Sequence, residues 1–437
     1  MPRRVKKKTD QGTHADLISD LPRNVIDGIL EHLPIRDAVR TSILSRKWRY
    51  MWVTSPRLEF DDKFFNGVMT NSNLGDYEIP NVITEVLLLH DGPINKFVLD
   101  IPPDYPVRIR CLGQWILFLS RNRINDLELV NQQAEAYEIP SHLFSCLDLT
   151  YLELSNFRLA TPPDFSGFQS LAALHCYDIR FASTALENFI CGCPLLEELT
   201  ISYCSGFESL NISAASLKIL YIEDARVIKS ICFKKAKNLI DLTIILNRSA
   251  ENVDGGRRSS NLTNFFSYLP KIEKLCLVDG YIKFLSSGSI PETLPKLLYN
   301  LKHLELDGIN FNEAGDTLLT VCLLRSSPNL VELDIKSHTS LLHPALNLLE
   351  GLDCNGFCLE QLRTVNIEVK SVSDTILDLV QFLLTNSPSM EVLTFKVGLR
   401  KQSDAYRLLN ISRDLLQLGR ASPRAEINFL YEGVEGT

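Results

Sequence analysis

The residues best suited to chemistry are cysteines and histidines, because thiolates and imidazoles are the usual protein ligands of transition metals. Two close pairs of cysteines, Cys191 with Cys193 and Cys354 with Cys358, have a spacing that could begin a metal site. Neither pair is accompanied by a second pair or by a histidine at ligand spacing, so structural thiols buried in the core are the better interpretation. We expect no metal site.

Two histidines and one pair of arginines are the other candidates for ligand binding. His175 stands in an apolar, strand-like segment, where a hydrogen-bonded core residue is a better interpretation than a ligand, and His303 precedes a Leu-x-Leu strand, where a solvent-facing position is ordinary. Arg257 and Arg258 could contact a phosphate, although a solvated loop is the better interpretation. The chain has no phosphate-binding Gly-x-x-x-x-Gly-Lys, no Gly-x-Ser-x-Gly and no His-Glu-x-x-His. We therefore expect no cofactor and no catalytic residue.

Composition narrows the class of protein further. The 437 residues include 45 lysines and arginines against 53 acidic residues, a formal net charge of -8, which argues against nucleic acid as the main partner. The 11 cysteines are scattered through apolar runs, as in a reduced cytosolic or nuclear protein. No signal peptide and no apolar run of about 20 residues is visible, so no membrane partner is expected. Residues 1–15 are predicted to be a disordered basic tail, either a nuclear-import signal or an ordinary solvated end. The expected location is the nucleus, the cytoplasm or both.

Residues 16–56 form the most informative segment. Pro22 suits the first position of a helix, where its missing N–H costs nothing, and Ser19 or Asp20 could cap that helix. The apolar residues that follow recur at intervals of three and four and share one helical face, and Pro34 ends the helix. These apolar residues are Val25, Ile26, Ile29, Leu30 and Leu33.

Two more short helices are predicted in the second half of this segment. Asp37 could cap the first and Ser45 the second, and the second helix would place Trp48, Met51 and Trp52 on one side. About forty residues bury too little surface to be stable alone. The apolar stripe is therefore predicted to be an interface with a partner, and packing on the neighbouring domain of the same chain is the alternative.

The segment resembles the F-box of plant F-box proteins, which reads Ile-Ser-x-Leu-Pro, then Ile-Leu-x-x-Leu-Pro, then Ala-Val-x-Thr-Ser-x-Leu-Ser-x-x-Trp-Arg-x-x-Trp. Ile18 to Trp52 match this pattern almost throughout, apart from Arg23-Asn24, where the family usually has an acidic pair, and Gly28 in mid-helix. The resemblance implies binding to a Skp-family adaptor and, through it, to a cullin. Trp52 would also help to seat the last helix on the rest of the chain. The adaptor-binding residues that the resemblance implies are Leu21, Pro22, Ile29, Leu30, Leu33, Pro34, Val39, Leu44, Trp48 and Trp52.

A repeat begins at about residue 95. Segments of the form Leu-x-Leu or Leu-x-Ile return at intervals of about 21 to 33 residues, the range of leucine-rich repeats. Each segment is predicted to be a short strand whose alternate side chains point inward, and stacking would let neighbouring repeats form one continuous core. The segments are Leu99 with Ile101, Leu127 with Leu129, Leu152 with Leu154, a weak candidate at Leu174-His175-Cys176, Leu199 with Ile201, Leu220 with Ile222, Leu242 with Ile244, Leu275 with Leu277, Leu304 with Leu306, Leu333 with Ile335, Val365 with Ile367, and Leu393 with Phe395.

The end of the chain has a resemblance of its own. Residues 358–367, 375–393 and 420–427 look like the FBD module that closes many plant F-box/leucine-rich-repeat proteins. An atypical last unit of this kind would cap the open end of a repeat stack. The expected fold is thus α/β: a basic tail at 1–15, a three-helix F-box at 16–56, a connecting helix and loop at 57–94, a leucine-rich-repeat solenoid, or horseshoe, at 95–354, and the FBD module at 355–437, with a helix at 406–418 and a final strand at 425–431.

The resemblance implies a function in protein degradation. The chain would be the substrate-recognition subunit of an SCF-type ubiquitin ligase, a non-catalytic adaptor whose F-box binds a Skp adaptor and whose repeats bind an unknown target protein. Two alternatives stay open. The repeats could serve a non-degradative scaffold, or they could hold a small molecule as a co-receptor.

Overall fold

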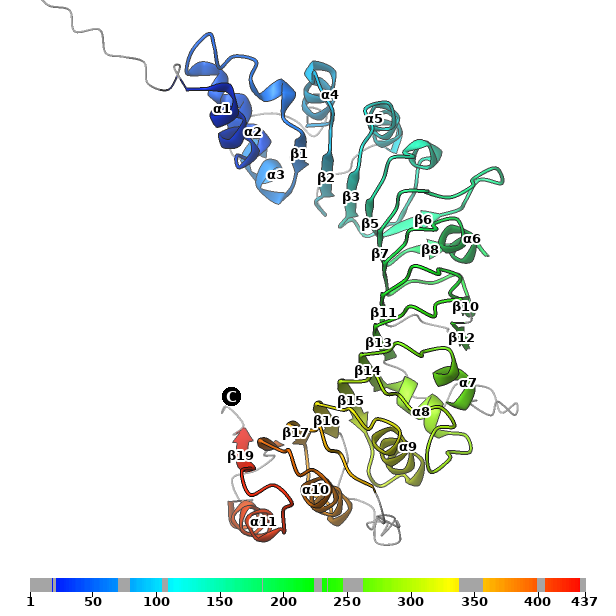
Figure 1. Cartoon of the computed structure of the whole chain (residues 1–437). Helices are drawn as coiled ribbons and strands as arrows, with labels where there is room; N and C mark the ends of the chain where they lie inside the picture. Colours follow the sequence, from blue (N-terminus) through cyan, green and yellow to red (C-terminus); the bar gives the residue numbers. More distant parts are fainter. Residues whose placement is uncertain are drawn as a thin grey trace, which may run out of the picture. The chain divides into compact units, whose positions relative to one another are not determined.

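The structure, a computed structural model, describes residues 18, 21–69, 79–103, 109–182, 184–223, 230–233, 235–246, 262–337, 357–398 and 405–432. The chain divides into two compact units. Unit 1 contains the residues up to 135 together with 140–149, and unit 2 contains 136–139 and the residues from 150 onward. Figure 1 labels most of the helices and strands of both units. The predicted basic tail, Arg257, Arg258 and Cys354 lie outside the described residues.

Unit 1 opens with two α-helices at the predicted places. The first, α1 (Arg23–Glu31), starts one residue later than expected, because Pro22 occupies the position just before the helix. Pro34 stands in the same way before α2 (Ile35–Arg40), which continues into the single turn of 3-10 helix η1 (Thr41–Ile43). Each proline lacks an N–H and fixes φ, so both suit the start of a helix.

The third predicted α-helix is not formed. Residues 44–51 are turns that lead into a short 3-10 helix, η2 (Trp52–Thr54). The Trp48 N–H bonds to the Ser45 carbonyl three residues back, at 3.2 Å, as in a turn. Both proposed caps were wrong: Asp37 lies inside α2, and the hydroxyl of Ser45 is buried without a hydrogen-bond partner among the described residues.

The connection predicted at 57–94 already contains a strand. In unit 1, β1 (Arg57–Phe60) pairs in parallel with β2 (Lys96–Ile101), and β2 pairs with β3 (Asp126–Asn131). Leu58 and Phe60 fill the positions that leucines fill in β3, and phenylalanine in the second position hid this repeat in the sequence. The register also corrects β2, where Phe97 and Leu99 are the equivalent pair. The helices of unit 1 beyond the F-box segment are α3 (Asp62–Met69), α4 (Ile79–Leu89), α5 (Ile109–Arg121) and the 3-10 helix η3 (Ser141–Ser145).

Unit 2 is built on one parallel sheet in which each strand pairs with the next repeat's strand. Every predicted Leu-x-Leu segment of this unit, including the weak candidate Leu174-His175-Cys176, lies in one of these strands, and its two apolar side chains are buried. The strands, in their order across the sheet, are β5 (Tyr151–Ser155), β7 (Ala173–Tyr177), β9 (Glu198–Ser202), β11 (Ile219–Glu223), β13 (Asp241–Leu246), β14 (Lys274–Asp279), β15 (His303–Ile309), β16 (Glu332–Ser337), β17 (Thr364–Val369), β18 (Val392–Gly398) and β19 (Glu426–Glu432).

The helices of unit 2 lie on the outer side of this sheet, and the strands line its inner side (Figure 1). None of the described helices, in either unit, is long and apolar enough to cross a membrane. The helices are α6 (Ala185–Cys191), α7 (Leu262–Ser267), α8 (Gly280–Ser286), α9 (Ala314–Arg325), α10 (Asp374–Asn386) and α11 (Ala405–Gln417). Short strands complete the connections as β4 (Tyr137–Glu138), β6 (Phe157–Leu159) and β8 (Arg180–Phe181) in one small sheet and β10 (Ser209–Asn211) and β12 (Ser230–Cys232) in another.

The C-terminal segment continues the same sheet. β16 pairs with β17 in unbroken register, and α10, α11 and β19 each begin within one residue of the predicted position. The strand-helix-strand order predicted for residues 358–431 is therefore confirmed as secondary structure.

A buried carboxylate links two neighbouring helices on the outer side of the sheet, α8 and α9. Asp316 of α9 has no exposed surface, and it accepts hydrogen bonds from the Ser286 hydroxyl at 2.6 Å and the Asn310 N–H at 3.0 Å. Burial raises the pKa of this carboxyl group, while the two hydrogen bonds oppose that shift. The pair of bonds joins α9 to α8 and to the turn after β15.

The structural feature of the Cys191-Gly-Cys193 segment is its glycine, Gly192, which allows a close contact between two backbones. The backbone of Gly192 approaches that of Gly167 so closely that a Cβ on Gly167 would lie 1.8 Å from the Gly192 carbonyl oxygen. Gly167 also has φ of +97°, which side chains rarely adopt. The prediction of buried thiols is correct for Cys193 and wrong for Cys191 and Cys358, which are both exposed.

We expect Leu242→Ala to lower the free energy of unfolding by about 2–5 kcal/mol, because it leaves a cavity between neighbouring repeats where the side chain is fully buried. The adjacent Thr243→Ala is the matched control. It changes the opposite face of the same strand and should cost less than about 1 kcal/mol. Denaturant titration followed by circular dichroism measures both values. Equal losses would contradict the assignment of the two faces.

Gly167→Ala should destabilise the fold by roughly 1–3 kcal/mol, since it adds a clash and a strained φ at one position. Gly28→Ala should act in the opposite direction by about 0.5–1 kcal/mol, because Gly28 lies inside α1 with nothing within 4 Å of the added Cβ. Melting temperatures of the two variants test these signs. A Gly167 variant as stable as the wild type would mean that the two backbones do not meet as described.

At neutral pH, iodoacetamide should modify Cys191 and Cys358 in the folded chain and leave Cys146 and Cys204 intact. Burial blocks access to the latter two thiols and raises the pKa of each to about 12. Cys358 should react more slowly than Cys191, because partial burial and Glu360 raise its pKa. Peptide mass spectrometry before and after denaturation gives the order. Early labelling of Cys204 would contradict the packing of β7 against β9.

Candidate functional site

The F-box segment is held together by contacts between its beginning and its end. The Trp48 indole N–H donates a hydrogen bond to the carbonyl of Ile18 at 3.2 Å, and the Lys47 ammonium donates to the carbonyl of Leu21 at 3.1 Å. These bonds fold the first residues over the last turns. The Leu-Pro start and the Trp end of the motif thus depend on one another in space, which accounts for their occurring together at fixed spacing.

Three of the ten predicted adaptor-binding residues form the core of this segment. Leu30, Trp48 and Trp52 are all nearly fully buried, and Trp48 retains only 2% exposure. Trp52 lines an apolar pocket of about 260 Å³ together with Phe64 of α3 and Val86 of α4. It therefore seats the end of the F-box segment on the helices that accompany the first strands. As the segment stands, these three residues have little surface left for a partner.

The other predicted residues keep surface available. Ile29 is 39% exposed and Leu44 is 52% exposed, and Pro22 and Pro34 are exposed as well. Leu21, Leu33 and Val39 are half-buried. The predicted set consequently divides into residues that hold the segment together and residues that face outward.

Sequence reasoning missed further outward-facing apolar residues. Ile43 is 87% exposed on η1, and Ile18 and Tyr50 are also exposed. Val25, which belongs to the apolar stripe predicted to be an interface, is exposed as well. The available signal was weak, because the residues at positions 43 and 50 fall where the family motif accepts any amino acid. An unpaired group of exposed apolar side chains on a small helical segment is typical of a protein interface.

A second surface lies on the inner side of the sheet of unit 2. The residues that alternate with the buried leucines on β5, β7, β9, β11 and β13 turn their side chains toward this inner side, and they include three tyrosines, four carboxylates and one histidine. We call this the tyrosine-carboxylate surface. It consists of Tyr151, Glu153, His175, Tyr177, Glu198, Tyr221, Glu223 and Asp241.

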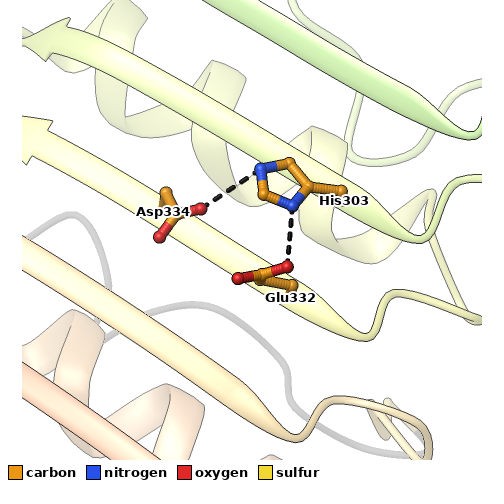
Figure 2. Close-up of side chains that lie close together, drawn as sticks. All are labelled: His303, Glu332 and Asp334. Carbon is orange, nitrogen blue, oxygen red and sulfur yellow. Dashed lines mark hydrogen bonds and ion pairs between the residues drawn. The ribbon is translucent and has the colours of Figure 1, made fainter. Parts of the chain in front are cut away.

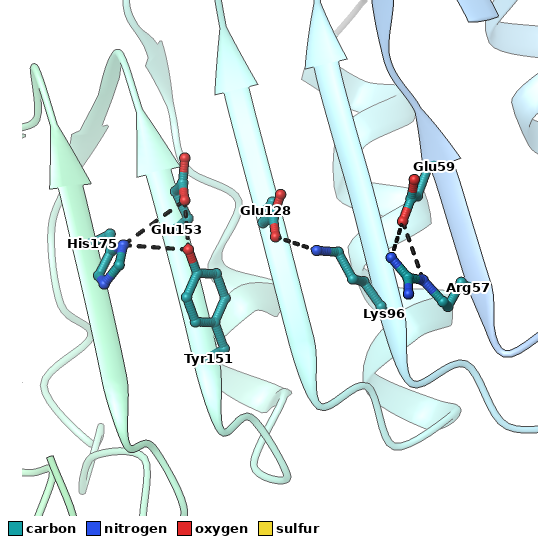
Figure 3. A network of polar contacts seen from close by, with 7 residues as sticks. All are labelled: Arg57, Glu59, Lys96, Glu128, Tyr151, Glu153 and His175. Carbon is teal, nitrogen blue, oxygen red and sulfur yellow. Dashed lines mark hydrogen bonds and ion pairs between the residues drawn. The ribbon is translucent and has the colours of Figure 1, made fainter. Parts of the chain in front are cut away.

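His175 belongs to this surface and is not the core residue that was predicted. The buried side chains of β7 are Leu174 and Cys176, so the alternation of the strand turns His175 outward. Its Nε2 lies 3.3 Å from a carboxylate oxygen of Glu198, and its Nδ1 lies 3.3 Å from the hydroxyl of Tyr151. That hydroxyl donates to Glu153 at 2.6 Å (Figure 3).

Hydroxyl groups surround the next carboxylate along the sheet. Glu223 accepts hydrogen bonds from Ser202 at 2.8 Å and from Tyr221 and Tyr203 at 3.0 Å each. Burial and the bond to Glu223 raise the pKa of Tyr221 to about 12. Burial also raises the pKa of Tyr177, and nearby glutamates add to the shift. These tyrosines stay neutral at physiological pH and can act as hydrogen-bond donors.

The charges differ farther along the sheet, where cations and carboxylates neutralise one another. Lys336 of β16 contacts Glu305 at 3.1 Å and Asp307 at 3.3 Å, and these contacts raise its pKa. Lys396 lies 3.7 Å from Glu368. The same balance holds in unit 1, where Lys96 pairs with Glu128 and Arg57 with Glu59 (Figure 3).

One cluster within the described residues has a composition that could hold a metal ion. His303, Glu332 and Asp334 present ligand atoms within 4.8 Å of one another. Both nitrogens of the imidazole, however, already face carboxylates, with Nδ1 2.9 Å from Glu332 and Nε2 3.2 Å from Asp334 (Figure 2). Each ring nitrogen thus has a carboxylate partner within the sheet, so these contacts explain the cluster without a metal ion. It faces outward, as was predicted for His303.

Comparison with known proteins identifies the families to which the two segments are similar. The family model of the F-box domain matches residues 18–60. The family model described as FBD-associated F-box protein At5g56370, LRR repeats, matches residues 112–335, which include most of the strands above.

Relatives in Arabidopsis thaliana extend over almost the whole chain. F-box/FBD/LRR-repeat protein At1g13570 is 37% identical over 96% of this chain and 100% of its own length. F-box/LRR-repeat protein 13 is 27% identical over 94% of this chain and 96% of its own length. Among solved structures, the leucine-rich repeat-containing protein LegL7 of Legionella pneumophila matches 82% of this chain and 96% of its own length at 16% identity, with a TM-score of 0.30. On the family models and the full-length relative together, the chain belongs to the plant F-box/FBD/LRR-repeat proteins.

Proposed function

We propose that this protein is the substrate-recognition subunit of an SCF-type ubiquitin ligase. The observation that carries the proposal is the group of exposed apolar side chains on the segment that matches the F-box domain. Those side chains would dock a Skp-family adaptor, which would connect the chain to a cullin. The protein would act in the nucleus, the cytoplasm or both, and it would carry no active site of its own.

The docking surface proposed here differs from the one read from the sequence. Ile29, Ile43 and Leu44 would enter the adaptor directly, with the exposed prolines Pro22 and Pro34 at the edge of the contact. Full burial of one large apolar side chain contributes about 1.5–3 kcal/mol, so a few such residues suffice for a stable subunit contact before association costs. Leu30, Trp48 and Trp52 would support this surface from below.

The repeats would hold the target protein. A target bound there and an adaptor bound at the F-box belong to the same complex, so lysines of the target would meet the charged conjugating enzyme at a high effective concentration. We assign residues 355–437 to the FBD module. Their last strand, β19, covers β18, as expected of a terminal unit that closes a repeat stack.

The double variant Ile29→Ala, Leu44→Ala should weaken capture of a purified Skp-family adaptor at least about tenfold, because it removes two exposed apolar groups from the proposed contact. Its thermal stability should stay close to that of the wild type, since both side chains are outside the core. A pull-down or surface plasmon resonance titration with the full chain measures the loss.

Leu88→Ala is the matched control for this measurement. Leu88 lies on α4 in the same unit and is 73% exposed, but it is outside the segment that matches the F-box. Its replacement should leave adaptor binding unchanged. Failure of the wild-type chain to capture any adaptor, or equal loss in the Leu88 variant, would overturn the proposal.

A further inference from the structure

The tyrosine-carboxylate surface has an unusual balance of charge. Its outward positions on β5, β7, β9, β11 and β13 hold Glu153, Glu198, Glu223 and Asp241, and every outward residue of these strands is described. None of them is a lysine or an arginine. The strands lie side by side in unbroken parallel register, so the four carboxylates belong to one continuous patch.

The contacts of these carboxylates leave most of the negative charge without a cation. Glu153 and Glu223 accept hydrogen bonds from tyrosine and serine hydroxyls. Glu198 faces His175, and Asp241 lies 3.8 Å from Lys274 of the next strand. By contrast, the lysines on β16 and β18 stand directly beside carboxylates.

The patch also contains a pocket of about 530 Å³ between its strands. Its walls include Tyr177, Tyr221 and three carboxylates, Glu198, Glu223 and Asp241, against one lysine, Lys274, and one histidine, His175. A lysine ammonium or an arginine guanidinium in this pocket would meet carboxylates at ion-pair distance and tyrosine rings at cation-π distance. An anionic ligand would meet mainly repulsion.

We infer that the tyrosine-carboxylate surface binds a basic, extended segment of a protein. Five adjacent strands at a spacing of about 4.8 Å span about 19 Å, which is the length of roughly six residues of extended chain. A segment with lysine or arginine at alternate positions can direct several cations onto the carboxylates, whereas a small cation would occupy only one wall of the pocket. That this segment comes from a ubiquitination target rests on the proposed function, but the binding itself does not.

The test is fluorescence anisotropy with the full chain and a fluorescein-labelled peptide, Lys-Ser-Arg-Ser-Lys-Ser. The basic peptide should bind at least about tenfold more tightly than its counterpart Glu-Ser-Asp-Ser-Glu-Ser, and added salt should weaken it because the contacts are exposed ion pairs. The double variant Glu198→Gln, Glu223→Gln should weaken binding of the basic peptide roughly three- to tenfold. Glutamine keeps the shape of each side chain, and circular dichroism confirms that the variant is folded.

The double variant Glu332→Gln, Glu368→Gln is the matched control. It removes the same charge from outward positions of β16 and β17, beyond the patch. It should change peptide binding by less than about twofold. Equal weakening in both variants, or similar binding of the basic and acidic peptides, would overturn the inference.

Adaptor capture, measured on the same preparation, separates this inference from the proposed function. Loss of peptide selectivity with intact adaptor capture would overturn the inference alone. Selective peptide binding without adaptor capture would support the basic-segment site and overturn the ligase proposal.

Discussion

The stacking of buried leucine pairs is the interaction on which the rest of this structure depends. A single strand such as β13 turns Leu242 and Ile244 toward the hydrophobic core and cannot bury them alone. Each repeat is therefore stable only when it is packed against its neighbours. The parallel register follows, because equivalent residues must meet to close the core. Additional polar fastenings such as Asp316 sit on the outer side, where they join one helix to the next without interrupting the stack.

The F-box segment forms its core from fewer residues and without repeats. It has two short helices and a series of turns, and its core centres on Ile26, Leu30 and Trp48. Hydrogen bonds from Trp48 and Lys47 to the first residues replace the third helix as the means of closing the segment. A core this small cannot enclose all the apolar side chains of the segment, so some of them stay exposed. A partner surface is the natural place for them, since no neighbouring element of unit 1 covers them among the described residues.

The sequence predicted most of the fold because the regularly spaced leucines mark the buried positions of each repeat. The prediction failed where another residue type replaces leucine or where a local signal, such as a helix cap, competes with packing. β1 was overlooked because Phe60 stands for leucine, and the third F-box helix was wrong because turn hydrogen bonds and the burial of Trp48 outweigh the cap at Ser45.

The candidate site was predicted less well. Helical periodicity gathers apolar residues onto one face, but only packing decides that Leu30 is enclosed and Ile29 is not. His175 was misplaced because an apolar context was given more weight than strand alternation.

The alternation within each strand also separates two kinds of evolutionary constraint. In β9, Leu199 and Ile201 are buried in the core, so packing restricts which residues can replace them. Glu198 lies on the inner side of the sheet, where its side chain reaches solvent and packing restricts it less. If the repeats bind the target as proposed, mutations at such positions would change recognition strongly while changing stability little. After a gene duplication, one copy could therefore acquire a new binding partner through a few substitutions on the inner side of the sheet while the buried residues stay unchanged.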